Sequence, residues 1–265
     1  MLPLNIIDAA QYAYKIVWQE RHYLLKLAFV PLIIKLLCFF AAVHFDDSNS
    51  IIRLSLFMLP AYFAEGWMLC HFVALMTKGQ RWPMMMTGNQ AQDLKTAKRR
   101  GRPLVAGILG FVLINMAMAL YFQTFTNFVP PEMLAGEAVD PNALPPQNAF
   151  IITMMFVLMI VVFKYVWLYI PLASDAGLMP YIHKTRGFMM SLRFIALWVL
   201  CFLPTIFIMQ VFMSLVSFQG NGEHVNYAAG LIRVLLDTVK NLICTAGFTF
   251  VMLQLFNGQQ KGGKL

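Results

Sequence analysis

The sequence predicts an all-α polytopic membrane protein with six transmembrane helices. Of its 265 residues, 60% are hydrophobic and only 12% are charged, whereas a soluble domain holds about 25% charged residues. Six apolar segments are long enough to cross a hydrocarbon core of about 30 Å, for which a helix needs roughly 20 residues. We therefore expect much of the protein surface to face lipid rather than water.

An amphipathic helix is expected first, over Leu4–Trp18. Apolar side chains recur there at helical intervals, while Asp8, Gln11 and Lys15 fall on the opposite side. The segment is too polar to span a bilayer and suits the membrane surface. Residues 1–22 are therefore assigned to an interfacial helix. Because no basic stretch precedes the first apolar run, we do not expect a cleaved signal peptide.

A six-helix transmembrane domain is predicted over residues 23–256, followed by a cytoplasmic tail over residues 257–265. The spans are Tyr23–Val43, Ile51–Thr77, Leu104–Phe125, Ala149–Leu172, Leu192–Phe218 and Gly230–Phe256. Pro60 in the second span removes one backbone hydrogen bond from its helix. Ala106, Gly107 and Gly110 in the third span would let another helix approach closely.

A repeated pattern predicts three helical hairpins. Three times, a polar or amphipathic segment precedes a pair of spans, and Ser174–Ser191 is a second amphipathic connector. The segments HYLLKLAFVP and LRFIALWVLCFLP both close an apolar stretch with proline. Parallel repeats occur in membrane proteins, but any two apolar helices look alike. A true repeat and a coincidence therefore remain alternative explanations.

The distribution of positive charge predicts the orientation. With the N-terminus, the two basic connectors and the tail on one side, that side carries fifteen of the twenty Lys and Arg residues. The loops on the other side carry no Lys or Arg but hold six of the twelve acids. Because Lys and Arg accumulate in cytoplasmic loops, we expect both termini in the cytoplasm.

The connector Lys78–Pro103 is strongly basic and directly precedes the third span. Five of its residues form what we call the basic cluster: Lys95, Lys98, Arg99, Arg100 and Arg102. Such a run resembles a nucleic-acid patch in composition alone. Next to a span it is better placed to contact anionic lipid headgroups, at about 1 kcal/mol per basic residue. Membrane lipids are therefore the expected partners, and nucleic acid is not.

Charged residues within the predicted spans are the candidates for a functional site. They are Lys35, Glu65, Lys164, Arg233, Asp237 and Lys240. Ionisable groups at membrane depth are costly and commonly mark substrate or ion pathways. They can instead pair with one another, as Arg233, Asp237 and Lys240 could on one helical face. Because no transporter motif accompanies them, we favour the structural interpretation.

Glu65 and Lys35 are expected to form one such pair. Each lies near the middle of its span, and the two spans are joined by the short turn His44–Ser50. An antiparallel hairpin would bring the two side chains together at similar depth. His71 lies six residues after Glu65, roughly 240° around the helix, so the sequence does not support a Glu–His relay within this helix.

Motifs for catalysis and metal binding are missing from the sequence. The four cysteines are widely spaced within apolar segments and form no C-x-x-C pair, so we expect small buried side chains. No H-E-x-x-H or G-x-S-x-G motif occurs. The segment Gly258–Lys264 fits G-x-x-x-x-G-K, but Leu265 follows instead of Ser or Thr, without the helix that would hold phosphate. We therefore expect no enzyme, metal site or cofactor.

Two stretches resemble a known family. AEGWMLCHFVALMTKG, and KYVWLYIPLA…KTRGFMMSLRFIAL around Lys164–Leu197, are similar to bacterial six-span proteins akin to the membrane domain of glycerophosphodiester phosphodiesterases. A Trp and then a His close the second span in that family, and Trp67 and His71 match them. Phe72 stands where the family often has arginine. These residues include no phosphodiesterase catalytic domain, so the resemblance implies a membrane scaffold and not the reaction.

Together, these observations favour a non-enzymatic inner-membrane protein with a scaffolding, assembly or lipid-organising role. A membrane-protein partner or a homo-oligomer would fit that role. The alternative is a transporter or permease-like subunit with a polar intramembrane site around Glu65. The substitution Glu65→Gln would separate the two, because a structural pair predicts lost stability and a transport site predicts lost flux with assembly intact.

Overall fold

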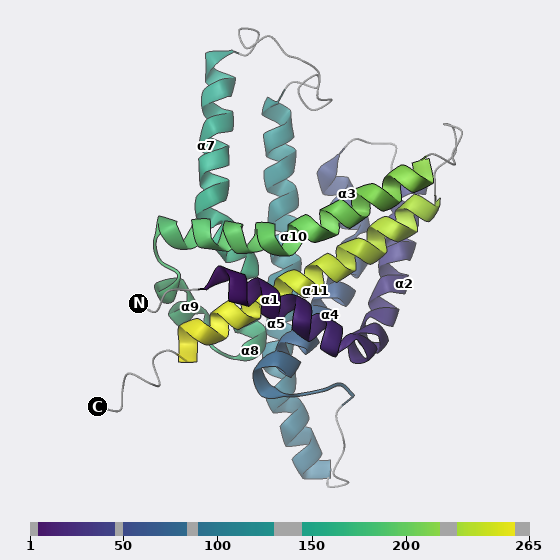
Figure 1. Cartoon of the computed structure of the whole chain (residues 1–265), viewed down its shortest axis with the longest axis vertical. Helices are drawn as coiled ribbons and strands as arrows, with labels where there is room; N and C mark the ends of the chain where they lie inside the picture. Colours follow the sequence, from purple (N-terminus) through teal and green to yellow (C-terminus); the bar gives the residue numbers. More distant parts are fainter. Residues whose placement is uncertain (1–4, 46–49, 84–89, 130–144, 218–226, 258–265) are drawn as a thin grey trace.

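The computed structural model describes residues 5–45, 50–83, 90–129, 145–217 and 227–257, and within these ranges it contains helices and no strands. The elements follow in the order α1 (Ile6–Gln19), α2 (Arg21–Phe45), α3 (Ile51–Phe57), α4 (Leu59–Lys78), α5 (Gln90–Phe128), α7 (Pro146–Val162), the 3-10 helix η2 (Phe163–Trp167), α8 (Tyr169–Ser174), α9 (Leu178–Lys184), α10 (Phe188–Ser217) and α11 (Tyr227–Asn257) (Figure 1). Six helical segments of this described chain are long and apolar enough to cross a membrane. The predicted fold class, an all-α polytopic membrane protein, is confirmed.

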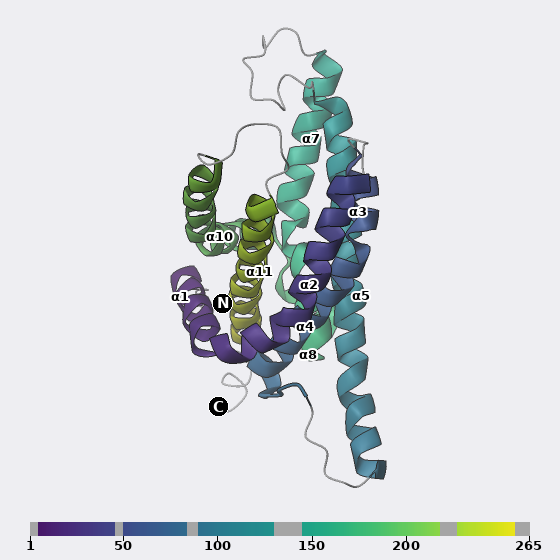
Figure 2. The ribbon, with the colours of Figure 1, turned by 90° about the vertical axis from the view of Figure 1, so that its right-hand side faces the viewer.

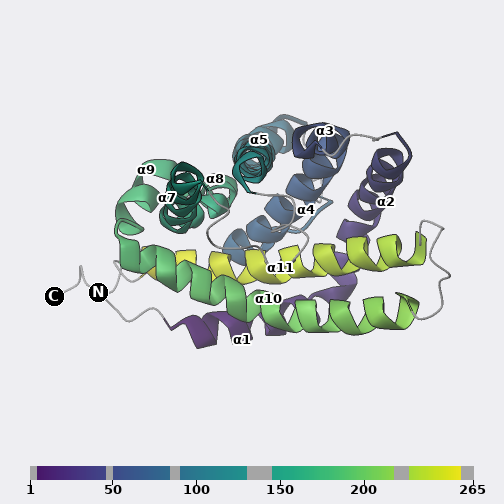
Figure 3. The same ribbon diagram turned by 90° about the horizontal axis from the view of Figure 1, so that it is seen from above.

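Consecutive spans pack against each other as antiparallel pairs. α2 packs on α4, α5 packs on α7 and α8, and α10 packs on α11. Figures 1 and 2 show α5 and α7 standing side by side, whereas Figure 3 shows α10 and α11 running across one side of these upright helices. α11 is the central element, because it also contacts α1, α2, α4 and α8. α4 also packs on α5, the next span along the chain, so the packing does not separate three hairpins from a continuous bundle, and the repeat stays a prediction.

The N-terminal amphipathic helix is α1, and it packs on protein through its small side chains. Asn5 caps its first turn by accepting hydrogen bonds from the backbone N–H groups of the second and third residues after it. Ala9 and Ala13 are fully buried, and α1 contacts α10 and α11. Tyr14 Oη donates to the carbonyl oxygen of Cys201 at 2.9 Å, and burial raises the pKa of Tyr14 to about 12. α1 therefore braces the last hairpin, and its placement at a membrane surface stays a prediction.

The second predicted span, Ile51–Thr77, is not one helix. It is broken at Met58 into α3 and α4, and Pro60 lies in the first turn of α4. A proline has no backbone N–H, so the helix restarts where that donor would have no partner anyway. α4 then ends at Gly79, whose φ of 63° is the left-handed conformation typical of helix C-termini.

The third span is longer than the apolar segment predicts. We expected a separate basic connector before Leu104, but α5 runs without a break from Gln90 to Phe128, with Pro103 inside it. Figure 2 shows that this helix extends well beyond the other helices at its N-terminal end. The basic cluster is therefore part of a rigid helix that continues into the span.

The fourth span changes its helical form before it ends. α7 gives way to the 3-10 helix η2 over Phe163–Trp167 and then to the short α8. Pro171 in α8 has no N–H to donate to the carbonyl four residues earlier, which lies at the end of η2. Asp175 and Gly177 follow with φ of 65° and 83°, and this turn leads into α9. The predicted connector Ser174–Ser191 is thus partly helical, and α10 begins at Phe188 rather than Leu192.

Close helix contacts occur where the third span carries glycines. A Cβ on Gly107 would lie 2.7 Å from Cys70 Sγ and 2.8 Å from Ala173 Cβ, and one on Gly110 would lie 2.9 Å from Leu172 Cδ1. Ala173 Cβ is fixed to its backbone and cannot move aside, so no atom larger than hydrogen fits at Gly107. The helices α4, α5 and α8 therefore meet closely here, as the small residues of the third span predict. Residues 258–265 of the predicted tail lie outside the described residues.

Candidate functional site

An ion cluster lies where α2, α4 and α11 meet, three helices that are neighbours in Figure 3. Lys35 Nζ from α2 donates to both carboxylate oxygens of Glu65 from α4, each at 2.9 Å. The same ammonium group donates to Asp237 Oδ2 from α11 at 2.6 Å. Asp237 in turn pairs with Lys240, and Asn241 Nδ2 donates to Glu65 Oε1 at 2.7 Å. The Lys35–Glu65 contact that the sequence predicts is present.

The ion cluster is electrically balanced and unevenly buried. Two lysines face two carboxylates, so the group has no formal net charge. The side chains of Lys35 and Glu65 are only 8% and 5% exposed, whereas Asp237 is 34% exposed and Lys240 24%. Burying such charges is tolerable only when every charge is paired and hydrogen-bonded. The ion pairs therefore hold α2, α4 and α11 together, a stabilising role that we call the structural lock.

A stripe of polar side chains continues from the ion cluster along α11. Asp237, Asn241, Thr245 and Thr249 recur every four residues and so lie on one face of the helix. Thr245 and Thr249 are fully buried, and each donates its hydroxyl to the carbonyl oxygen four residues earlier, at 2.6 and 2.7 Å. Since the proton of Thr245 is used in this way, the hydroxyl of Tyr169 donates to Thr245 Oγ1 at 2.7 Å.

Asn241, Thr245 and Tyr169 are polar partners that the sequence interpretation missed. The signal that could have found two of them is the four-residue spacing that begins at Asp237 in the sixth span. Uncharged polar residues are common in spanning helices, where they bond their own backbone. Asn241 and Thr245 differ from such residues because they also bond side chains of other helices, namely Glu65 and Tyr169. These contacts can be seen in the structure and not in the sequence.

Lys164 and Arg233 do not join the ion cluster. Lys164 lies in η2, where its ammonium group donates to the carbonyl oxygen of Gly187 at 3.4 Å and lies 5.1 Å from the ring centre of Tyr165. It is buried, with an exposed fraction of 5%. Arg233 is exposed on α11. Asp237 pairs with Lys35 and Lys240 rather than with Arg233, so the expected grouping on this helix forms only in part.

Trp67 and His71, which carry the family resemblance, lie in contact on α4. Their ring centres are 4.8 Å apart, and Trp82 covers both at 5.2 and 6.3 Å. The backbone N–H of Trp82 donates to the hydroxyl of Tyr23 at 3.0 Å. These aromatic side chains pack the segment after α4 against the start of α2. His71 thus has a packing role in this structure.

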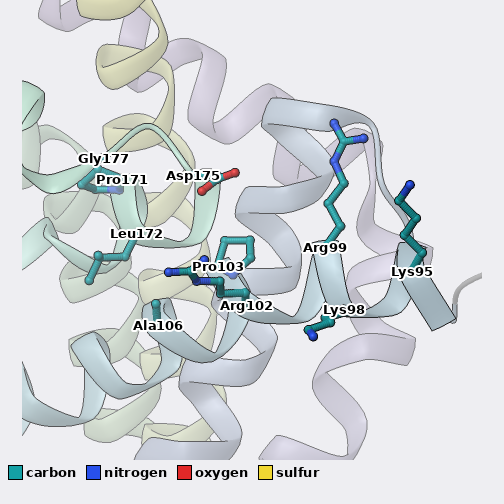
Figure 4. A pocket seen from close by; sticks show the side chains of 10 residues that line it. All are labelled: Lys95, Lys98, Arg99, Arg102, Pro103, Ala106, Pro171, Leu172, Asp175 and Gly177. Atoms are coloured by element: carbon teal, nitrogen blue, oxygen red, sulfur yellow. The ribbon is translucent and has the colours of Figure 1, made fainter.

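The basic cluster lies on the N-terminal half of α5, next to the turn between α8 and α9. A cavity of about 640 Å³ opens there, and four of the five basic residues line it: Lys95, Lys98, Arg99 and Arg102. Its other walls are formed by Pro103, Ala106, Pro171, Leu172, Asp175 and Gly177 (Figure 4). A second cavity of about 400 Å³ shares Arg99 and Asp175 with the first, and Lys78 and Arg100 line it. The structure therefore turns the basic cluster into one side of a cavity.

The chemistry of these two sites differs. The ion cluster holds paired charges and no lone cation or anion to bind a ligand, whereas the cavity presents cationic groups. Within the described ranges, no group of three His, Cys, Asp or Glu side chains is placed to hold a metal ion. The described cysteines carry free thiols. The cavity beside α5 is thus the better candidate for ligand binding.

Comparison with known proteins gives no match for this chain. No protein-family model, no curated protein and no solved structure is similar to it. The function must therefore be argued from the residues and the geometry described above.

Proposed function

We propose that this chain is a non-enzymatic polytopic protein of a bacterial inner membrane that organises anionic lipids at the cytoplasmic surface. The observation that carries this proposal is the continuity of α5 over Gln90–Phe128. The N-terminal part of this helix, from Gln90 to Arg102, carries the basic cluster, and we call it the basic arm. Because the same helix continues into the apolar span, the basic arm is held at a constant distance from the membrane. A flexible basic connector would not hold its charges in this way.

Electrostatics gives the arm its affinity for anionic headgroups. Each basic residue near an anionic leaflet contributes about 1 kcal/mol, and this attraction acts within a Debye length of the surface. Four of the five residues of the basic cluster are exposed, and Arg100 is half-buried. Together they favour association with lipids such as phosphatidylglycerol over zwitterionic lipids.

The predicted orientation of the chain also favours the cytoplasmic side of the membrane for the basic cluster. The basic cluster belongs to the loops that carry fifteen of the twenty Lys and Arg residues, which favours the cytoplasm. The start of α2, the end of α4, and α8 and α9 lie toward the same end of the molecule as the basic arm (Figure 1). A scaffolding role toward a membrane-protein partner or a second copy is compatible with this surface, as is the resemblance to the membrane scaffold of glycerophosphodiester phosphodiesterases.

The proposal is tested by neutralising the basic cluster. The chain with all five residues changed to Gln should lose its preference for phosphatidylglycerol over phosphatidylcholine when the bound lipids are counted by native mass spectrometry. The matched control exchanges Lys for Arg and Arg for Lys at the same positions, which retains every charge and should retain the preference. Equal lipid binding by the neutral variant and the original chain would refute the proposal.

A transporter function is the second candidate, and the exposure of Asp237 and Lys240 favours it. These side chains open one end of the ion cluster, at 34% and 24%. Against it, both carboxylates are held by lysines, and a permeating cation would have to displace them. Vesicles with a trapped pH-sensitive dye measure proton flux directly. We expect the original chain and Glu65→Gln to leak at the rate of empty vesicles, and a flux that Glu65→Gln abolishes would favour the transporter.

A further inference from the structure

The cavity beside α5 has two chemically different sides. Its cationic side carries four basic side chains against one carboxylate, Asp175, which leaves a formal charge of +3. Its other side is apolar and is formed by Pro103, Ala106, Pro171 and Leu172. A volume of about 640 Å³ lies within the range of about 300–1,000 Å³ that is typical of ligand pockets.

The cationic side suits a phosphate group. Arg99 and Arg102 each present a planar fork of N–H donors that matches phosphate oxygens in pairs, and lysines add charge. In Figure 4, the side chain of Arg102 extends along the wall toward Ala106 and Leu172, so its guanidinium group lies at the border between the two sides. A ligand held by Arg102 would therefore contact apolar surface at the same time.

The apolar side argues for a lipid rather than a free phosphate. From Pro103 onward, α5 becomes apolar and enters the predicted span, so the cavity lies at the level where headgroups meet acyl chains. Pro103 and Pro171 are themselves buried, and a small phosphate would leave the half-buried Ala106 and Leu172 facing water. A phospholipid would place its phosphate among the basic groups and its glycerol and first acyl carbons against the apolar wall.

We propose that this cavity is a specific binding site for the headgroup of one anionic phospholipid. The proposal rests on the lipid-organising function proposed above and adds to it a defined site, a stoichiometry of one, and a role for the wall that α8 supplies. The neighbouring cavity, with Lys78 and Arg100, extends the positive surface beyond the site. General attraction of the arm to a charged leaflet needs neither the wall nor the cavity.

The decisive variant fills the cavity without changing any charge. Ala106→Phe adds a ring on the cavity wall, and Val105→Phe adds the same ring at the neighbouring position, which is 54% exposed and is not part of the wall. The probe is short-chain phosphatidylglycerol, titrated against the full chain in mild detergent, with phosphatidylcholine as reference. We expect roughly tenfold weaker binding for Ala106→Phe, which corresponds to about 1.4 kcal/mol, because the ring occupies the space of the ligand. We expect a change of less than about twofold for Val105→Phe.

A charge variant gives a second, independent test if Ala106→Phe fails to fold. Arg102→Gln should weaken binding by about tenfold or more, because it removes charge-assisted hydrogen bonds to phosphate. Arg100→Gln, two residues away on roughly the opposite side of α5 and outside this cavity, should show no more than the roughly fivefold loss expected from general attraction. Equal losses at the two arginines, or at Ala106 and Val105, would overturn the proposed site.

Two further outcomes separate the possible causes of failure. If glycerol phosphate binds the original chain as tightly as phosphatidylglycerol does, the site takes a free phosphate ester and the lipid assignment is wrong. If the original chain does not prefer phosphatidylglycerol over phosphatidylcholine at all, the proposed lipid-organising function fails and the site fails with it. If the original chain prefers phosphatidylglycerol but the two members of each variant pair lose the same affinity, the proposed site is wrong and the lipid-organising function stands.

Discussion

Glu65→Gln tests whether the ion cluster is a structural lock. The carboxylate accepts both bonds from Lys35 at 2.9 Å and one from Asn241 at 2.7 Å, and its side chain is 5% exposed. The neutral amide keeps the shape and can still accept from Asn241. It removes one negative charge, so the ion cluster gains a formal charge of +1 in an apolar bundle.

The expected cost follows from what remains around Lys35. Breaking a buried ion pair costs about 3–5 kcal/mol because the partner charge stays buried. Lys35 keeps Asp237 at 2.6 Å, so Glu65→Gln should lie at the low end, about 3 kcal/mol. Lys35→Met should cost about 5 kcal/mol, since it leaves two carboxylates with Lys240 as the one remaining lysine of the ion cluster.

The free energy of unfolding can be measured by titrating the protein in mild detergent with dodecyl sulfate and following far-UV circular dichroism. Glu20→Gln is the matched control, because Glu20 pairs with Arg81 at 2.8 Å on the surface, where the side chains are 22% and 58% exposed. A pair in that setting contributes about 0–1 kcal/mol. Glu65→Gln should therefore be clearly more damaging than Glu20→Gln.

A double variant completes the test. Lys35→Met with Glu65→Gln restores the charge balance and leaves Asp237 paired with Lys240. It should be more stable than Lys35→Met alone, which is the coupling expected of side chains in contact. Simple addition of the two single losses, or a Glu65→Gln loss no larger than that of Glu20→Gln, would refute the lock.

Three other predictions concern packing, the polar stripe and topology. Gly107→Val should lower stability by about 3 kcal/mol through overpacking, as seen in the melting temperature, whereas Gly101→Val, with open space around it, should not. Thr245→Val should cost about 1–3 kcal/mol because it leaves the Tyr169 hydroxyl buried without an acceptor; a change below 0.5 kcal/mol, by the order of surface substitutions, would contradict this. A reporter fused after the C-terminus should lie in the cytoplasm and one within residues 132–140 on the opposite side; the reverse pattern would contradict the orientation.

The fold class could be read from the sequence because it depends on local properties. A bilayer requires about 20 apolar residues per helix, and this requirement is visible in any stretch without knowledge of its neighbours. The ends of the elements could not be read in the same way. Backbone hydrogen bonding does not stop where polarity changes, so α5 continues through the basic residues from Gln90. Pro60 and Pro171, in contrast, shape their helices through local chemistry that the sequence does display.

The candidate sites show the same division. A charged residue in an apolar segment is conspicuous, so Lys35, Glu65 and Asp237 were found from the sequence alone. That Asp237 binds Lys35, 202 residues away in sequence, was decided by the packing of α11 against both α2 and α4. The role of Asn241 had the same origin, since a neutral amide becomes significant only when a buried carboxylate lies beside it. The sequence likewise determined the charge of the basic arm, but only the turn after α8 placed an apolar wall against it, because a cavity exists only between segments that the chain brings together in space.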